Sequence, residues 1–332
     1  KECWAGEFHH FWLRGQELGI AEPFGDYCIE LQAAKQNKFA YGEQMPMNFA
    51  YHLDATAYAR YLREFAEQHG VTRREGKISK VHKHTNDGSI KSVELEDGSV
   101  LEGDFFVDCT GFRGLLIEKA LHSGYDDWSH YLICDSAVAI QTESQSAPKP
   151  YTRSIAHEYG WQWRIPLQHR NGNGLVYSSA HLNKEQAEDF LLKHLDAKAL
   201  SEPNHIRFKT GRRRKQWHKN VVAVGLSSGF LEPLESTSIH LIQQAISWLI
   251  SLFPTEGIDD NLIKRFNQQM TVETETIRDF IVLHYHLQQR DDHEFWRYLR
   301  EMKVSDRLQQ IMDLFHNNGT IVEEQDDLFA EN

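Results

Sequence analysis

The hydrophobic residues between positions 53 and 69 recur at the spacing of an α-helix. Tyr58, Leu62 and Phe65 fall on one face of this segment, and Gly70 follows it where a left-handed residue commonly ends a helix. The same spacing returns toward the end of the chain. There it predicts helices at residues 239–253, 261–284 and 293–302. We therefore expect an α-rich C-terminal part.

Between these helices the hydrophobic pattern changes to that of β-strands. Short runs separated by Asn-Asp-Gly and Asp-Gly turns predict a three-stranded meander, at residues 77–82, 90–94 and 100–104. Two continuous apolar runs, at residues 105–108 and 221–224, each end in a loop that carries glycine. Buried parallel strands show this pattern when their loops reach a ligand. The sequence therefore predicts an α/β core whose ligand lies over the strand ends.

Composition and charge narrow the class of protein. The 332 residues contain 36 Lys+Arg and 48 Asp+Glu, and this net charge of −12 argues against nucleic acid as a partner. We expect no membrane partner, because no apolar run approaches the length of a membrane span. The 4 cysteines show no C-x-x-C spacing, which suggests reduced thiols in the cytoplasm. We expect no metal site, and a solvated turn at the basic residues 212–215.

The loop that follows residue 224 allows two interpretations. Residues 225–229, Gly-Leu-Ser-Ser-Gly, match the nucleophile elbow of serine hydrolases, with Ser227 as the nucleophile. However, Pro233 interrupts the helix that should follow an elbow, and no H-G-G-G-type oxyanion segment precedes the loop. We favour the second interpretation, in which small residues let the backbone approach a ligand or a neighbouring helix.

Glu235 and three hydroxyl residues precede the predicted helix at Ile239. One of Ser236, Thr237 and Ser238 is expected to cap this helix. The amides of Thr237 and Ser238 would then lie at the positive end of the helix dipole, where an anion can bind. A carboxylate such as Glu235 is unfavourable beside a bound anion, and such conflicts are typical of functional sites. An ordinary helix cap is the alternative.

Two tryptophans stand two positions apart in the segment Trp161-Gln162-Trp163-Arg164-Ile165-Pro166. In an extended segment both side chains lie on the same face. Core packing or a cross-strand pair is one interpretation. The other is an aromatic wall beside a planar ligand. The spacing alone fits both.

Together these motifs resemble the flavin-dependent tryptophan halogenase family. The family's signature W-x-W-x-I-P is complete at residues 161–166. Residues 225–237 are similar to its flavin and halide loop, and residues 107–114 to its second flavin-contacting strand. The resemblance implies an α/β fold of the FAD-dependent monooxygenase type, with a Rossmann-type FAD-binding core and β-meander at residues 1–238. An α-helical C-terminal region would follow at residues 239–332.

The resemblance also implies roles for individual residues. Glu235 is similar to the family's catalytic glutamate, and the amides of Thr237 and Ser238 are similar to its halide-binding pair. Residues similar to those that contact FAD are Ile78, Asp108, Thr110, Gly111, Trp161, Trp163, Ile165, Pro166, Gly225, Leu226, Ser227, Gly229, Phe230, Pro233 and Ile239. Trp161 and Trp163 would separate the flavin from the organic substrate.

The implied reaction is the FADH2-dependent halogenation of an electron-rich aromatic substrate, such as tryptophan, indole or a related compound. It would use O2 and chloride or bromide, through hypohalous acid. A separate flavin reductase would supply FADH2, and a homodimer is compatible with the resemblance. A flavin-dependent aromatic monooxygenase of the same fold is the second interpretation, and a serine hydrolase that uses Ser227 is the third.

The chain departs from the family pattern in two respects. No G-x-G-x-x-G phosphate loop occurs in residues 1–332, so the first βαβ unit has no counterpart. The family's catalytic lysine belongs to that unit, and no lysine here is given its role. The sequence also stops before the C-terminal segment that helps to enclose the substrate. We therefore expect an internal fragment of a longer protein, which by itself binds FAD weakly and is inactive.

Overall fold

The computed structural model describes residues 6–42 and 47–321. Its helices are α1 (Phe8–Glu17), η1 (Phe24–Tyr27), α2 (Ile29–Lys35), α3 (Ala55–Gln68), η2 (Gly111–Arg113), η3 (Leu115–Ala120), α4 (Lys184–Lys193), η4 (Gly225–Ser227), η5 (Pro233–Glu235), α5 (Ser238–Ser251), α6 (Asp260–Leu287), α7 (Glu294–Glu301) and α8 (Asp306–Asn318). Its strands are β1 (Ile78–Lys83), β2 (Ile90–Leu95), β3 (Val100–Glu102), β4 (Phe106–Asp108), β5 (Tyr125–Asp127), β6 (Ser136–Thr142), β7 (Arg153–His157), β8 (Gly160–Pro166), β9 (Asn171–Tyr177), β10 (Asn204–Arg207), β11 (Gly211–Arg213), β12 (Trp217–His218), β13 (Val221–Ala223) and β14 (Gly229–Phe230).

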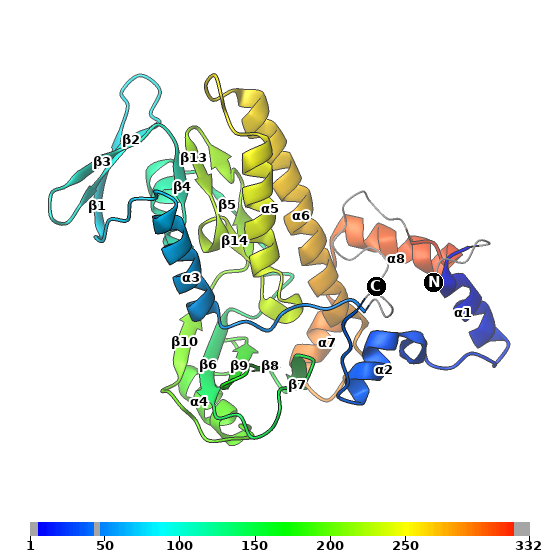
Figure 1. Ribbon diagram of the computed structural model, residues 1–332. Coiled ribbons are helices and arrows are strands. Elements are labelled where there is room, and N and C mark those ends of the chain that lie inside the picture. The colour runs from blue at the N-terminus through cyan, green and yellow to red at the C-terminus, as the bar shows by residue number, and fades with distance from the viewer. Residues whose placement is uncertain (1–5, 43–46, 322–332) are drawn as a thin grey trace.

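The predicted meander is present as the antiparallel sheet β1-β2-β3. Its two turns lie at the predicted Asn-Asp-Gly and Asp-Gly sequences. In each turn an aspartate side chain accepts a hydrogen bond from the amide two residues later, Asp87 from Ser89 and Asp97 from Ser99. The meander packs through Ile90 against η3, and it lies at one end of the molecule (Figure 1).

The two predicted parallel strands are neighbours in a second sheet. β13 pairs with β4 in parallel, and β12 adds to the other side of β13 in antiparallel fashion. β13 is buried, whereas β4 lies at the edge of its sheet and leaves Val107 48% exposed. The prediction of a buried strand is therefore correct for β13 and wrong for β4. Because the two strands are parallel, Asp108 and Gly225 lie at the same edge of the sheet.

The segment with the two tryptophans forms β8 in a five-stranded antiparallel sheet, ordered β10-β6-β9-β8-β7, which the hydrophobic pattern did not predict. One face of this sheet packs on α4 through Ala187 and Leu191. Trp161, on β8, belongs instead to a cluster with Ile281 of α6 and Phe295 of α7. Figure 1 shows this sheet at the lower end of the long helix α6.

The C-terminal part is helical, as predicted. α5, α6 and α7 lie at the predicted positions, and α8 follows them. α5 and α6 lie side by side (Figure 1) and bury Ala245, Phe266 and Met270 against Trp217 and Val222 of the second sheet. The predicted division between residues 238 and 239 therefore cuts through a shared hydrophobic cluster.

The predicted helix at residues 53–69 is α3, and Asp54 caps it by accepting hydrogen bonds from two first-turn amides. Its apolar stripe of Tyr58, Leu62 and Phe65 is partly exposed to solvent. None of the helices in the described part of the chain is both long enough and apolar enough to span a membrane.

Candidate functional site

Asp108 anchors the loop at the carboxyl end of β4. Its side chain is completely buried and accepts five hydrogen bonds. One oxygen accepts from the amide and hydroxyl of Thr110 and from the hydroxyl of Ser227. The other accepts from the amides of Leu116 and Ile117 in the first turn of η3, where a negative charge is favourable. Asp108, Thr110 and Ser227 are thus one connected unit.

Ser227 is a structural residue of this unit. Its side chain is completely buried, and its hydroxyl lies 3.2 Å from both Asp108 Oδ1 and the Gly111 carbonyl oxygen. A serine nucleophile needs a base within hydrogen-bond reach. In the described ranges, no histidine is hydrogen-bonded to this hydroxyl. The serine hydrolase interpretation therefore does not fit the geometry.

The basic residues 212–215 form the expected solvated turn only in their second half, because Arg214 and Lys215 are exposed whereas Arg212 and Arg213 belong to β11. Arg213 is 7% exposed, and its guanidinium donates to the Ser227 carbonyl oxygen and to Glu118. Arg212 forms ion pairs with carboxylates of β5 and α6. The partner carboxylates come from distant parts of the chain, which is why the local charge run gave no sign of them. Arg213 thereby ties η3 to the loop at Ser227.

A small pocket of about 140 Å³ lies between the loop 225–231, the start of α5 and α6. The predicted site residues that line it are Gly225, Leu226, Gly229, Phe230 and Ser238. Gly225 has a φ of 67°, a left-handed conformation that favours glycine, and it turns the chain from β13 into η4. Leu226 projects from this turn and is 41% exposed. These five predicted residues come together at this pocket.

The hydroxyl residues before α5 do not cap it, contrary to our expectation. Thr237 occupies the N-cap position, and no side chain accepts a hydrogen bond from the first-turn amides. Ser236 instead has a φ of 55°, a strained conformation for a residue with a side chain, and turns the chain from η5, which Pro233 begins, into α5. Ile239 is exposed on the first turn. The start of α5 thus presents amides without a side-chain partner.

Glu235 pairs with a histidine of α6 that the sequence did not identify. Its Oε1 lies 2.9 Å from Nε2 of His284. The hydrogen bond to Glu235 is the largest cause that raises the pKa of His284, and it outweighs desolvation, which lowers this pKa. His284 Nδ1 lies 2.8 Å from the carbonyl oxygen of Phe280, so it donates there and orients the ring. Glu235 is therefore held toward α6.

A second glutamate, Glu232, was also missed. It is completely buried, and burial raises its pKa to about 7. The Tyr285 hydroxyl and the Cys134 thiol lower this pKa, but by less. Neither carboxyl oxygen of Glu232 meets a partner in hydrogen-bond geometry within the described residues. A lone acidic residue inside the apolar run Gly-Phe-Leu-Glu-Pro-Leu was the only sequence signal for it.

Of the two tryptophans of β8, Trp161 lies in the core of the molecule, and Trp163 is partly buried against the same cluster. Trp161 is 3% exposed, and the Trp163 ring packs beside it with the ring centroids 6.1 Å apart. Trp163 also lies directly over Gly174 of β9, where a Cβ atom would come within 2.0 Å of the ring. Neither tryptophan lines the pocket at Gly225. These contacts favour core packing over a wall beside the flavin, and the wall stays a prediction.

Three other predicted residues lie apart from this pocket. Ile78 is on the meander and packs beside the cluster of Ile90 and Ile117. Ile165 and Pro166 end β8, and Pro166 lines a different cavity of about 530 Å³. Aromatic rings line that cavity too, those of Phe39, Phe49, Tyr51 and Tyr151. Such a lining suits a flat apolar ligand.

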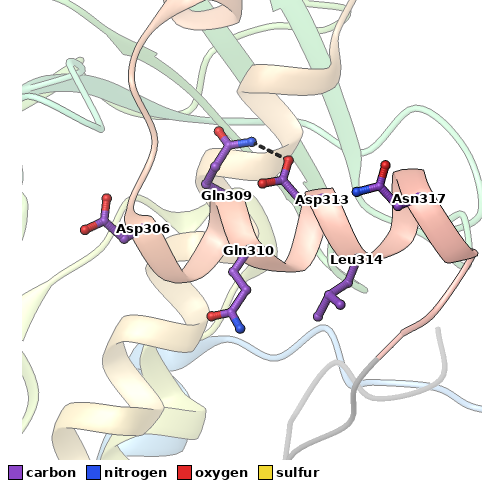
Figure 2. Close-up of a pocket in the computed structure, with 6 residues that line it drawn as sticks. All are labelled: Asp306, Gln309, Gln310, Asp313, Leu314 and Asn317. Atoms are coloured by element: carbon purple, nitrogen blue, oxygen red, sulfur yellow. Dashed lines mark hydrogen bonds between the residues drawn. The ribbon is translucent and has the colours of Figure 1, made fainter.

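A further hollow of about 340 Å³ lies along α8 (Figure 2). All of its labelled residues come from this one helix and its first turn, and Gln309 donates to Asp313 at 2.9 Å. It contains none of the predicted site residues. We therefore do not regard it as the functional site. Among the described residues, no three His, Cys, Asp or Glu side chains are grouped so that they could hold a metal ion.

Comparison with solved structures shows close similarity to two flavin-dependent halogenases. Xcc4156 from Xanthomonas campestris superimposes with a TM-score of 0.96 and 48% identity over 100% of this chain and 67% of its own. BrvH from Brevundimonas sp. BAL3 gives a TM-score of 0.94 and 43% identity over 100% of this chain and 69% of its own. This similarity confirms the predicted fold class, an α/β FAD-binding core with meander and helices.

Sequence comparison leads to the same family. The chain is 38% identical over 318 residues to tryptophan 7-halogenase RebH of Lentzea aerocolonigenes, and 37% identical over 317 residues to tryptophan 6-halogenase ThaL of Streptomyces albogriseolus. Each alignment covers 92% of this chain, which spans 59% of the length of these relatives. The sequence model of the tryptophan halogenase family matches residues 1–332. This chain belongs to the tryptophan halogenase family.

Proposed function

We propose that this chain contributes the halide-oxidising site of an FADH2-dependent halogenase that acts on an electron-rich aromatic substrate, with O2 and chloride or bromide. One observation carries the proposal. Glu235, held by His284, stands immediately before the uncapped start of α5 and close in sequence to the glycine-lined pocket. In a chain of this family, that arrangement combines an acid/base group with an anion site.

The residues around the small pocket fit a flavin ring. Carboxyl ends of parallel strands are where open α/β sheets bind their ligands, and Gly225 and the Asp108 loop lie there. Leu226 and Ile239 are exposed and would supply apolar contacts. Thr110, Gly111, Gly229, Phe230 and Pro233 would complete the cradle. Bound reduced flavin would supply the activation of O2 that oxidises the halide to hypohalous acid.

The first-turn amides of α5 would bind the halide. Thr237 is buried and Ser238 is exposed, and the backbone amides of both lie at the positive end of a 14-residue helix. No side-chain cap competes for these amides. Because the contact is through the backbone, it depends on the conformation of Ser236 more than on the identity of the side chains.

Glu235 would move a proton in the transfer step. Its carboxylate can accept the proton that leaves the aromatic ring, and its protonated form can donate one to the oxidant. When His284 is protonated, its Nε2 donates to Glu235 while its Nδ1 donates to the Phe280 carbonyl oxygen, and the ring so keeps the carboxylate oriented. The names of RebH and ThaL, both tryptophan halogenases, support a substrate that carries an indole ring. We further propose a separate flavin reductase as partner and a cytoplasmic location.

The test of this proposal replaces Glu235 with Gln in the full-length protein, which keeps the size but removes proton transfer. Halogenated product should fall by about 10²–10⁴-fold, the usual range for a lost general acid/base. Reduced-flavin oxidation by O2 should continue at nearly the original rate. Glu202→Gln makes the same change at an exposed residue and should leave both signals unchanged.

Two other outcomes would count against the proposal. Product within a few-fold of the unmodified enzyme would make Glu235 a structural residue of the loop. An equal loss of both signals would mean that the substitution had damaged the flavin site. Oxygenated product that forms without halide would favour the second interpretation, a flavin-dependent aromatic monooxygenase.

A further inference from the structure

The loop that carries Glu235 holds a second acidic residue that the proposed reaction does not use. Glu232 is 0% exposed, and neither of its carboxyl oxygens has a hydrogen-bond partner within the described residues. Its neighbour Leu231 belongs to the hydrophobic cluster that contains Trp161 and Tyr285. An ionised carboxylate is strongly disfavoured in such surroundings. The fold therefore favours Glu232 in its uncharged form.

Two titratable groups face Glu232, the phenol of Tyr285 on α6 and the thiol of Cys134 in the segment before β6. Burial raises the pKa of both groups well above their ordinary values, so both stay uncharged at neutral pH. No basic side chain of the described residues acts on Glu232. Burial is the largest cause that raises the pKa of Glu232 to about 7. Of these three groups, only Glu232 changes its charge near neutral pH.

The same loop meets α6 through two consecutive residues of that helix. Glu235 pairs with His284, and Glu232 faces Tyr285. Leu231 lies in the hydrophobic cluster to which α6 contributes, and Leu234 packs against this cluster. Only a short and partly buried segment separates Glu232 from Glu235. The position of Glu235 therefore depends on how Glu232 packs against α6.

We propose that Glu232 is a positioning residue, which in its uncharged form keeps this loop seated on α6 and so holds Glu235 beside His284 and the start of α5. The proposal rests on the proposed function of Glu235. When Glu232 ionises, an unpaired negative charge lies within the apolar cluster, and the loop is loosened. The site would therefore lose activity as the pH rises.

The direction of this effect follows from proton binding. The pKa of Glu232 is 4.5 without perturbation and about 7 in the folded chain, so between these values the folded state keeps a proton that the unfolded state has released. The stabilisation is complete below pH 4.5 and is lost as the pH rises through about 7. This shift corresponds to at most about 300-fold in the unfolding equilibrium constant.

The first measurement is denaturant unfolding of the full-length protein in on the order of ten buffers, which span pH 5 to pH 8.5. Glu232→Gln keeps the shape but cannot ionise, and Glu232→Met is a second uncharged variant in case Gln disturbs the fold. The unmodified protein should lose stability relative to both variants as the pH rises over this range, by about 70-fold in the unfolding constant, because part of the full effect of about 300-fold already lies below the first buffer. The exposed control Glu202→Gln should follow the unmodified protein. Parallel curves for all four proteins would overturn the proposal.

The second measurement is the pH profile of kcat for halogenated product, which a merely structural glutamate would not change. One pH unit above the pKa, the unmodified enzyme should fall about tenfold relative to Glu232→Gln, when both rates are normalised at pH 6. His284 still titrates in the variant. The kcat of the variant should therefore still decline as the pH rises, but the decline should involve the loss of one proton fewer than in the unmodified enzyme. Identical profiles would overturn the positioning role. If the unmodified enzyme gives no halogenated product, the proposed function itself fails, and the unfolding result still decides whether Glu232 is held uncharged.

Discussion

Individual polar residues hold the candidate site together, and most of them are anchors. Asp108 receives five hydrogen bonds inside the molecule, and Arg213 joins η3 to the Ser227 loop. A buried polar group is stable only if it is paired, so these residues fix the backbone of both glycine-bearing loops. In contrast to these buried anchors, the pair of Glu235 and His284 is partly open to solvent.

The pair of Glu235 and His284 should contribute to stability only while His284 is protonated. The pKa of His284 is raised above 6.5, so the contribution is complete below that pH and is lost as the pH rises through the raised value. Since the His284 side chain is 39% exposed, solvent screening limits the effect to below about 1 kcal/mol. The free energy of unfolding of His284→Gln should therefore differ from that of the unmodified protein at about pH 5.5 and converge with it near pH 8.5. These pH values lie about one to two units below and above the pKa of an ordinary histidine.

The matched control for this experiment is His130→Gln, a histidine exposed on the surface. It should leave the free energy of unfolding unchanged at both pH values. A constant difference between His284→Gln and the unmodified protein at every pH would show that His284 acts through packing alone, without its charge.

At the level of the elements, the tryptophans of the β8 motif contribute to the packing of the hydrophobic core. Trp161 is buried in the cluster of α6 and α7, whereas Trp163 lies half-buried over Gly174. Trp161→Ala should therefore cost about 3–5 kcal/mol in the free energy of unfolding, the range for a large core aromatic. Trp163→Ala should cost less because Trp163 is only partly buried. Thermal or denaturant unfolding of the two variants in the full-length protein measures both.

This comparison separates the two interpretations of the tryptophan motif. If the rings line a cavity beside the flavin, both variants should keep near-normal stability and change the product pattern. A loss confined to Trp161 supports core packing at that position. Trp128→Ala, in the same cluster, provides a reference for the cost of a buried tryptophan.

For the molecule as a whole, the helical region and the strand core share their interior. Trp217 and Val222 are 0% exposed because Phe266 and Met270 of α6 cover them. A chain that ends at residue 238 should therefore expose this cluster and fail to fold cooperatively. Near-ultraviolet circular dichroism and denaturant unfolding of residues 1–238, compared with residues 1–332, test this. A cooperative transition in the shorter chain would instead support an independent domain at the predicted boundary.

The sequence alone determined much of the local structure and the region of the site. Helical periodicity placed α3, α5, α6 and α7, and turn residues such as Asp87 and Asp97 placed the meander, because these signals depend on neighbouring residues. The resemblance carried by residues 161–166 and 225–237 identified the family, which the comparisons confirm. It also directed attention to Glu235, whose role remains a proposal.

Tertiary structure decided the features that depend on distant partners. The five-stranded sheet escaped prediction because its strands contain glycine and polar residues and are stabilised by α4, α6 and α7. Arg213 looked solvated because Glu118 lies far away in sequence. His284 and Glu232 acquire their properties only when α6 packs on the loop, which brings a carboxylate to one and excludes water from the other. Charge and burial at such positions arise from packing between elements, and no local pattern encodes them.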